Sequence, residues 1–134
     1  MAELTDIEGI GEVHSEQLAK AGIGSTASLL ERGATKKGRR EIADLSGATQ
    51  DQILAWVNRA DLFRIKGIGE EYSDLLECCG VDTVPDLAQR NAGNLCSTMV
   101  TVNEQRKLVR RLPVESEIAR WIDQAKKLPR VVLY

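Results

Sequence analysis

The segment Ile65-Lys66-Gly67-Ile68-Gly69-Glu70 occurs in similar form near the start of the chain, as Ile7-Glu8-Gly9-Ile10-Gly11-Glu12. Two glycines on either side of one aliphatic residue let a backbone turn through conformations that a Cβ atom would resist. The aliphatic side chain can then be held between the flanking helices. The sequence therefore predicts two sharp turns, each followed by a helix.

The similarity between these two stretches extends along the chain. A shift that places Ile7 on Ile65 aligns the first turn with the second and continues through the helix that follows, and a slightly longer shift aligns a later helix of each copy. Two tandem copies of one helical unit explain this pattern. The tryptophans recur on apolar faces, which favours core anchors over platforms for stacking on bases. The aligned pairs include Leu18 with Leu76, Gly22 with Gly80, Ser25 with Thr83, and Trp56 with Trp121.

Helix signals account for the segments between the turns, because apolar residues recur at helical spacing and no window alternates over the length of a strand. Thr49 followed by Gln52 has the spacing of a capping box and opens the longest helix of the first copy, with Trp56 on its apolar face. Residues 36–40 carry cations around a glycine and indicate a basic loop. A helix near residues 94–99 is expected in the second copy. The chain is predicted to be all-α.

Composition limits the classes of function. The 134 residues are 28% charged with a net charge of −2, so no overall basic field draws the protein to nucleic acid or anionic lipid, and any such binding must be local. The three cysteines, of which Cys78 and Cys79 are adjacent, fit neither a disulfide framework nor the spacing of a metal site. This usage predicts a reducing, cytoplasmic compartment. No membrane segment is expected, because no apolar run approaches the roughly 18 residues of a span.

Each turn places its second glycine where the next helix begins. The first backbone amides of a helix have no intrahelical partner and lie at a partial positive charge, which makes them ready ligands for an anion. At the second turn, Arg64 and Lys66 add positive charge on the approach to Gly67. Although Glu70 and Glu71 follow directly, this turn is the stronger candidate for holding a phosphate.

The first turn is surrounded by carboxylates instead. Asp6, Glu8 and Glu12 lie beside it, and no cation occurs before Lys20. Within about 10 Å, the screening length at ordinary salt, these carboxylates repel a phosphate about as strongly as the amides attract it. The turn Gly9-Ile10-Gly11 is therefore interpreted as structural, or as a surface that faces a protein.

The pattern hydrophobic-x-Gly-hydrophobic-Gly, followed four residues later by a small residue and then by leucine, resembles the helix-hairpin-helix motif. Here the small residues are Ser15 and Ser73, and the leucines are Leu18 and Leu76. The whole chain is similar to the tandem helix-hairpin-helix proteins of an uncharacterised, mostly bacterial family known as a domain of unknown function. Its hairpins are also similar to those of DNA polymerases, of ligases and of the C-terminal domain in the α-chain of RNA polymerase.

The resemblance implies two tandem helix-hairpin-helix repeats of about five short helices each, residues 1–61 and 62–134, packed as one compact unit. It also implies weak binding to a DNA backbone without sequence specificity, with hairpin amides and nearby cations meeting phosphates. Two basic clusters could add to this binding, although such clusters are more often solvated surface. The candidate nucleic-acid-binding residues are Arg64, Lys66, Gly67, Ile68, Gly69 and Glu70, together with the cluster Lys36, Lys37, Arg39 and Arg40. The second cluster comprises Arg106, Lys107, Arg110 and Arg111.

Nothing in the sequence predicts catalysis. His14 is the single histidine, no Ser or Cys has a recognisable base and orienting carboxylate, and the acids lie at ordinary helix-surface spacing. We expect a protein that is not an enzyme and holds no cofactor or metal. Two interpretations stay open: a module that binds nucleic acid, and a protein-interaction or scaffold module with purely structural hairpins, which the acidic balance favours. An accessory to a DNA-processing enzyme would differ from the first only in needing a partner.

Overall fold

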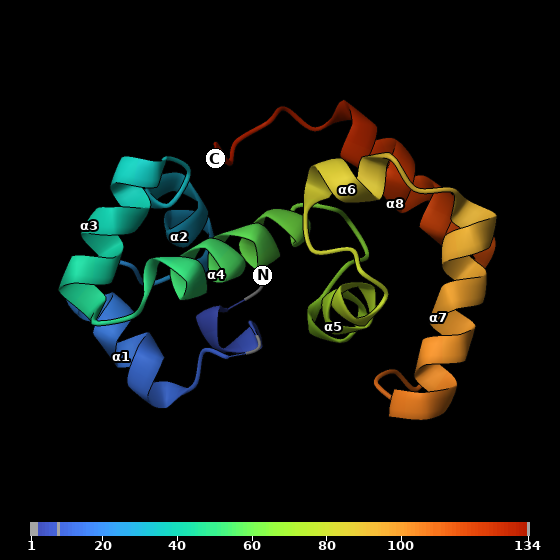
Figure 1. Ribbon diagram of the computed structural model, residues 1–134, viewed down its shortest axis with the longest axis horizontal. Helices are drawn as coiled ribbons and strands as arrows, with labels where there is room; N and C mark the ends of the chain where they lie inside the picture. Colours follow the sequence, from blue (N-terminus) through green and yellow to red (C-terminus); the bar gives the residue numbers. More distant parts are fainter. Residues whose placement is uncertain (1–2, 8, 134) are drawn as a thin grey trace. The chain divides into compact units, whose positions relative to one another are not determined.

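The computed structural model describes residues 3–7 and 9–133. Over these residues the chain forms eight α-helices and one short 3-10 helix, with no strand (Figure 1). The prediction of an all-α fold is therefore confirmed. The elements, in chain order, are η1 (Leu4–Asp6), α1 (Glu12–Lys20), α2 (Thr26–Arg32), α3 (Lys36–Ser46), α4 (Gln50–Leu62), α5 (Glu70–Cys78), α6 (Val84–Ala88), α7 (Ala92–Arg106) and α8 (Glu115–Lys127).

The chain divides into two compact units. Unit 1 comprises Met1–Asp61 and Arg130–Tyr134, and unit 2 comprises Leu62–Pro129. Unit 1 thus contains α1 to α3 and nearly all of α4, whereas unit 2 contains α5 to α8. After completing unit 2, the chain returns to unit 1 for its last residues.

In unit 1, α3 contacts both α1 and α2. The basic segment at residues 36–40 is helical and forms the start of α3, so the prediction of a loop was wrong. The Thr35 hydroxyl accepts a hydrogen bond from the Gly38 amide at 3.0 Å and caps the helix. Gly38 does not break the helix. It lets α3 pass close to the end of α2, because a Cβ atom there would collide with the Arg32 carbonyl oxygen.

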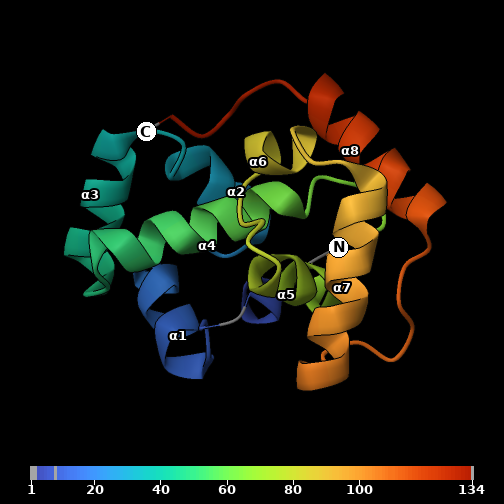
Figure 2. The ribbon, with the colours of Figure 1, turned by 45° about the vertical axis from the view of Figure 1, so that its right-hand side comes forward.

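In unit 2, α8 contacts both α6 and α7, and Figure 2 shows it beside these two helices. The helix expected near residues 94–99 is much longer, because α7 runs from Ala92 to Arg106. The Asn91 side chain accepts from the Asn94 amide at 3.0 Å and starts α7. The C-cap of α7 is Lys107, whose φ of 52° is left-handed.

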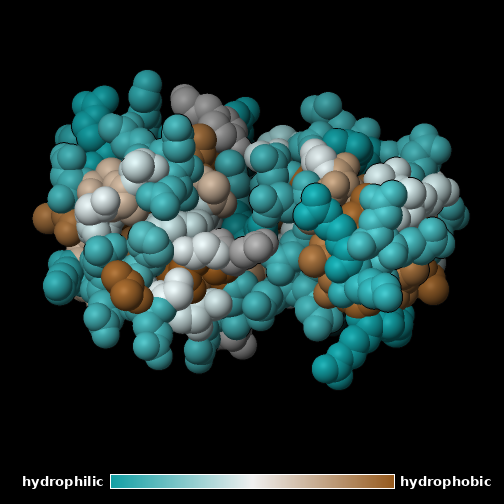
Figure 3. Space-filling view, turned by 60° about the horizontal axis from the view of Figure 1, so that its bottom comes forward, coloured by the Kyte–Doolittle hydropathy of each residue, from teal (hydrophilic) through white to brown (hydrophobic). Residues whose placement is uncertain are grey.

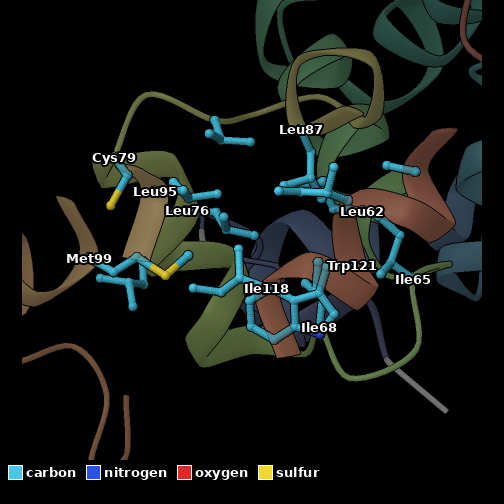
Figure 4. Packing of buried hydrophobic residues seen from close by; sticks show 14 of the residues in the cluster. Leu62, Ile65, Ile68, Leu76, Cys79, Leu87, Leu95, Met99, Ile118 and Trp121 are labelled. Carbon is cyan, nitrogen blue, oxygen red and sulfur yellow. The ribbon is translucent and has the colours of Figure 1, made fainter. Parts of the chain in front are cut away.

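The two tryptophans are core residues, as predicted. Trp56 is buried in unit 1 and Trp121 in unit 2. Figure 4 shows Ile65, Ile68 and Trp121 among the apolar side chains that fill the core of unit 2. The face of the molecule in Figure 3 is mainly hydrophilic, with apolar groups scattered between polar ones.

Candidate nucleic-acid interface

The second Gly-Ile-Gly turn is held by its own backbone and by its central side chain. The Ile68 amide donates to the Ile65 carbonyl at 3.1 Å, and Gly67 has a φ of +100°. The Ile68 side chain is 5% exposed and belongs to the core of unit 2. Burial of this side chain leaves only the backbone of Ile68 to take part in a surface contact.

Trp121 of helix α8 packs against the turn at Gly67. A Cβ atom on Gly67 would lie 2.8 Å from the indole Nε1 of Trp121, which is closer than two such atoms approach in proteins. The ring of Tyr72, in the first turn of α5, lies 5.2 Å from the Trp121 ring at an angle of 50°. The Tyr72 hydroxyl donates to the Arg111 carbonyl at 2.9 Å. Tyr72 is therefore a supporting residue and not an open stacking platform.

Gln124 of α8 holds the backbone of Lys66. The Lys66 amide donates to Gln124 Oε1 at 2.9 Å, and Gln124 Nε2 donates to the Lys66 carbonyl at 3.3 Å. The Lys66 residue itself is exposed. This pair of hydrogen bonds positions the residue while its ammonium group stays in solvent.

The N-terminus of α5 follows the turn directly. Its N-cap is Gly69, which has no side chain to accept a hydrogen bond from the first amides, and no described side chain caps the helix. Such amides carry the positive end of the helix dipole. Glu70 and Glu71 occupy the first turn and offset part of that positive charge.

Two surface clefts meet at Gly67. Their volumes are about 400 Å³ and about 300 Å³. The larger is lined by Gly67, Gly69, Glu70, Glu71, Tyr72, Arg110 and Arg111. The smaller is lined by Lys66, Gly67, Glu117, Arg120, Trp121 and Gln124.

Arg111 is already engaged by a carboxylate. Its two terminal nitrogens donate to the two oxygens of Glu117 at 2.8 and 3.0 Å. Hydrogen bonding to Arg111, helped by the Val114 amide, lowers the pKa of Glu117, and the same pair raises the pKa of Arg111. The side chains of Lys66, Arg110 and Arg120 make no hydrogen bond or ion pair within the part of the chain that the structure describes. The charge of Arg120 nevertheless helps to lower the pKa of Glu117.

Arg64, the other cation predicted beside this turn, is partly buried. Its guanidinium donates to the Pro129 carbonyl at 3.1 Å, so it connects the start of unit 2 to the second residue after α8. Lys66 is therefore the better placed of the two cations before the turn.

The first basic cluster lies in unit 1 and is divided by the fold. Lys36, Lys37 and Arg40 are exposed on α3, whereas Arg39 is 5% exposed. The Arg39 guanidinium donates to three backbone carbonyls. These belong to Gly33 at 2.7 Å, Ala34 at 3.1 Å and Leu133 at 2.6 Å. Arg39 thus has a structural position, and only the other three cations reach solvent.

The first Gly-Ile-Gly turn has a corresponding support. A Cβ atom on Gly9 would lie 3.2 Å from Trp56 Nε1, and His14 packs edge-on against Trp56 with ring centres 5.1 Å apart. Ile10 is buried, and Gly11 is the N-cap of α1. Glu8, one of the carboxylates expected beside this turn, lies outside the described residues.

Sequence reasoning missed Arg120 and named Arg110 only as a member of the second basic cluster, which could add to nucleic-acid binding. Arg110 lies in a basic run that also fits solvated surface. Arg120 precedes Trp121, and because the tryptophan marks the apolar face, its neighbour is expected on the outside of the helix. No local signal brings either arginine to Gly67, since both contacts depend on the tertiary fold.

Within residues 3–7 and 9–133, no cluster of three or more His, Cys, Asp or Glu side chains could hold a metal ion. Cys78, Cys79 and Cys96 are free thiols. None of the described helices is both long and apolar enough to cross a membrane.

The fold and this surface define an all-α protein with a cation-lined turn. A family model matches residues 8–128, and the chain belongs to that family, the domain of unknown function DUF4332. No curated protein and no solved structure matches the chain significantly.

Proposed function

We propose that the chain is a non-catalytic helix-hairpin-helix protein whose second turn binds a nucleic-acid backbone without sequence specificity. The observation that carries this proposal is the grouping of Lys66, Arg110 and Arg120 in the two clefts that meet at Gly67. These three cations come from separate segments of the chain and form no ion pair among the described residues, although the charge of Arg120 acts on Glu117.

A phosphate backbone suits this surface because it offers repeated anionic oxygens. The uncapped amides at the start of α5 can donate to one phosphate, and cations on either side of Gly67 can neutralise its neighbours. None of these groups reads a base edge. Glu70 and Glu71 oppose the anion, so the binding is weak and depends strongly on salt.

The helix-hairpin-helix interpretation gains support from matching element bounds. α1 begins at Glu12 and α5 at Glu70, each directly after a Gly-Ile-Gly turn, and both helices are nine residues long. α4 and α8 are both thirteen residues long. In each unit a buried tryptophan packs against the first glycine of the turn. This similarity supports two tandem repeats of one design.

Binding to a fluorescein-labelled DNA duplex, measured by anisotropy in about 50 mM salt, tests the proposal. Single substitutions Lys66→Glu, Arg110→Glu and Arg120→Glu should each weaken binding several-fold and reduce the magnitude of the salt slope by about one. Lys126→Glu is the matched control, because Lys126 is exposed on α8 and lines neither cleft.

Saturable binding that weakens equally in all four variants would reflect net charge alone and would refute a site at the turn. Absence of saturable binding would refute the proposal altogether. A chain with Lys36, Lys37 and Arg40 changed to glutamate shows whether the exposed cations of α3 make a second, independent contact.

A protein-interaction or scaffold module is the second candidate, and the surface of α1 favours it. Val13 is 67% exposed between Glu12 and Glu16, on a helix that follows the acidic first turn. An exposed valine flanked by carboxylates suits a partner with an apolar and basic surface. Affinity capture that recovers a protein with the wild-type chain, and loses it with Val13→Asp, would support this function. Unchanged capture would refute the role of Val13.

A further inference from the structure

Residues 130–133, which belong to unit 1, lie as an extended segment against the α2–α3 loop and α3. The Leu133 amide donates to the Ala34 carbonyl at 2.7 Å, and the Leu133 carbonyl accepts from Arg39 Nη2 at 2.6 Å. Both polar backbone groups of one residue are therefore satisfied by unit 1. Such pairing resembles the addition of one residue of a strand to a sheet edge, in which backbone hydrogen bonds provide affinity.

Arg39 is held in place independently of this segment. Its Nη1 donates to the carbonyls of Gly33 and Ala34, in the loop between α2 and α3. The other terminal nitrogen, Nη2, is thereby aimed at the position of the Leu133 carbonyl. Because the guanidinium is almost completely buried, it needs an oxygen acceptor at that position.

The side chains of this segment differ in burial. Val132 is 3% exposed, whereas Leu133 is 51% exposed although its backbone is bonded on both sides. Arg130 Nε donates to the Val132 carbonyl at 3.2 Å and stabilises the approach to the buried residue. Specificity thus rests mainly on Val132, with half-buried Val131 beside it, and the hydrogen bonds of Leu133 are made by its backbone.

We propose that unit 1 carries a docking site for an extended peptide, formed by Ala34 and Arg39, and that residues 130–133 occupy it as an exchangeable internal ligand. The ligand class is a short extended segment with an aliphatic residue directly before the residue that bonds to Ala34 and Arg39. Exchange is possible because the docked segment is short and is held by two hydrogen bonds of Leu133 and the burial of Val132, so it can detach without unfolding α1 to α4.

A labelled peptide tests whether the site accepts this sequence from outside the chain. The probe is a fluorescein-labelled peptide with the sequence of residues 129–134, Pro-Arg-Val-Val-Leu-Tyr. The receptor is the full chain carrying Val132→Asp, a substitution that releases the internal segment from the site. Saturable binding is expected to this variant. Binding to the wild-type chain should be at least about tenfold weaker, because a tethered ligand competes at an effective concentration near the millimolar range.

Arg39→Gln, added to the Val132→Asp chain, removes the cation that binds the carbonyl and should abolish peptide binding. Arg40→Gln is the matched control, because Arg40 is adjacent in sequence and exposed. Equal peptide binding to the wild-type chain, to the Val132→Asp chain and to the chain that carries both Val132→Asp and Arg39→Gln would overturn the proposal. Absence of peptide binding to the Val132→Asp chain would also overturn it.

Hydrogen exchange in the unmodified protein provides a second measurement that needs no destabilising variant. The Leu133 amide should exchange more slowly than a solvent-exposed amide, because it is bonded to Ala34. Excess unlabelled peptide should remove that protection by displacing residues 130–133 from the site. A Leu133 amide that is unprotected, or whose protection does not change with peptide, would contradict an exchangeable ligand.

Discussion

Substitution of Gly67 by alanine tests whether the contact with Trp121 supports the turn. An alanine at a positive φ costs about 1–2 kcal/mol. At a φ of +100° the new Cβ atom would also lie 2.8 Å from Trp121 Nε1, and overpacking of this kind costs about 1–3 kcal/mol. We expect Gly67→Ala to lower the free energy of unfolding by about 2–5 kcal/mol.

Gly69→Ala is the matched control two residues away. Gly69 has a φ of −113°, and a Cβ atom there would meet nothing within 4 Å. Its loss as an N-cap should cost less than about 1 kcal/mol. Gly9→Ala should fall between the two, since its Cβ atom would lie 3.2 Å from Trp56 Nε1 at a φ of +93°.

Urea unfolding followed by circular dichroism measures these differences, with the order Gly67, Gly9, Gly69 from the largest loss of stability to the smallest. A Gly67→Ala protein within about 0.5 kcal/mol of the wild type, the scatter expected for a neutral surface change, would refute the reasoning. So would equal losses for Gly67→Ala and Gly69→Ala, because only the first introduces a clash.

Three further predictions concern other parts of the fold. Thr35→Ala removes the cap of α3 and should cost about 1 kcal/mol in urea unfolding, whereas Thr35→Ser should restore most of it. Because the pKa of Glu117 is lowered in the folded state, its pairing with Arg111 stabilises the fold above pH 4.5, and this stabilisation is lost as the pH falls through the lowered pKa. Thermal unfolding from pH 6 to 2 should show this loss of stability. Glu117→Gln should remove that part of the pH dependence. Burial raises the pKa of the Cys79 thiol to about 11, so iodoacetamide at pH 8 should label exposed Cys78 well before Cys79, as mass spectrometry of the peptides would show.

The features that the sequence predicted well depend on neighbouring residues. A glycine on either side of Ile68 lets the backbone turn sharply at this point. The aliphatic side chain between the glycines is then expected to be buried in the core, as Ile68 is. The burial of Trp56 and Trp121 likewise follows from their places on helical faces rich in apolar residues.

Arg39 shows how a local pattern can mislead. Its charged neighbours suggested one basic surface, yet it shares the inner face of α3 with the buried residues Ile42 and Ser46, three and seven positions later. That helical spacing was visible in the sequence, but it had meaning only once residues 36–40 were recognised as helical. The assignment of a loop therefore concealed the burial of Arg39.

The composition of the candidate interface could not be derived in this way. Arg120 reaches the cleft beside Lys66 because α8 packs under the turn, and Gln124 from the same helix holds the Lys66 backbone. These contacts join residues that are far apart in the sequence. Periodicity describes which face of α8 is buried, but it does not specify which turn of chain that face meets.

The burial of one tryptophan in each unit has a practical consequence for spectroscopy. The sequence contains two tryptophans, and each indole lies against a different ring, His14 for Trp56 and Tyr72 for Trp121. The chain thus contains a separate intrinsic fluorophore for each unit. Replacing either indole by phenylalanine leaves an emission signal that reports on the other unit alone, so the unfolding of the two halves can be followed separately without an added label.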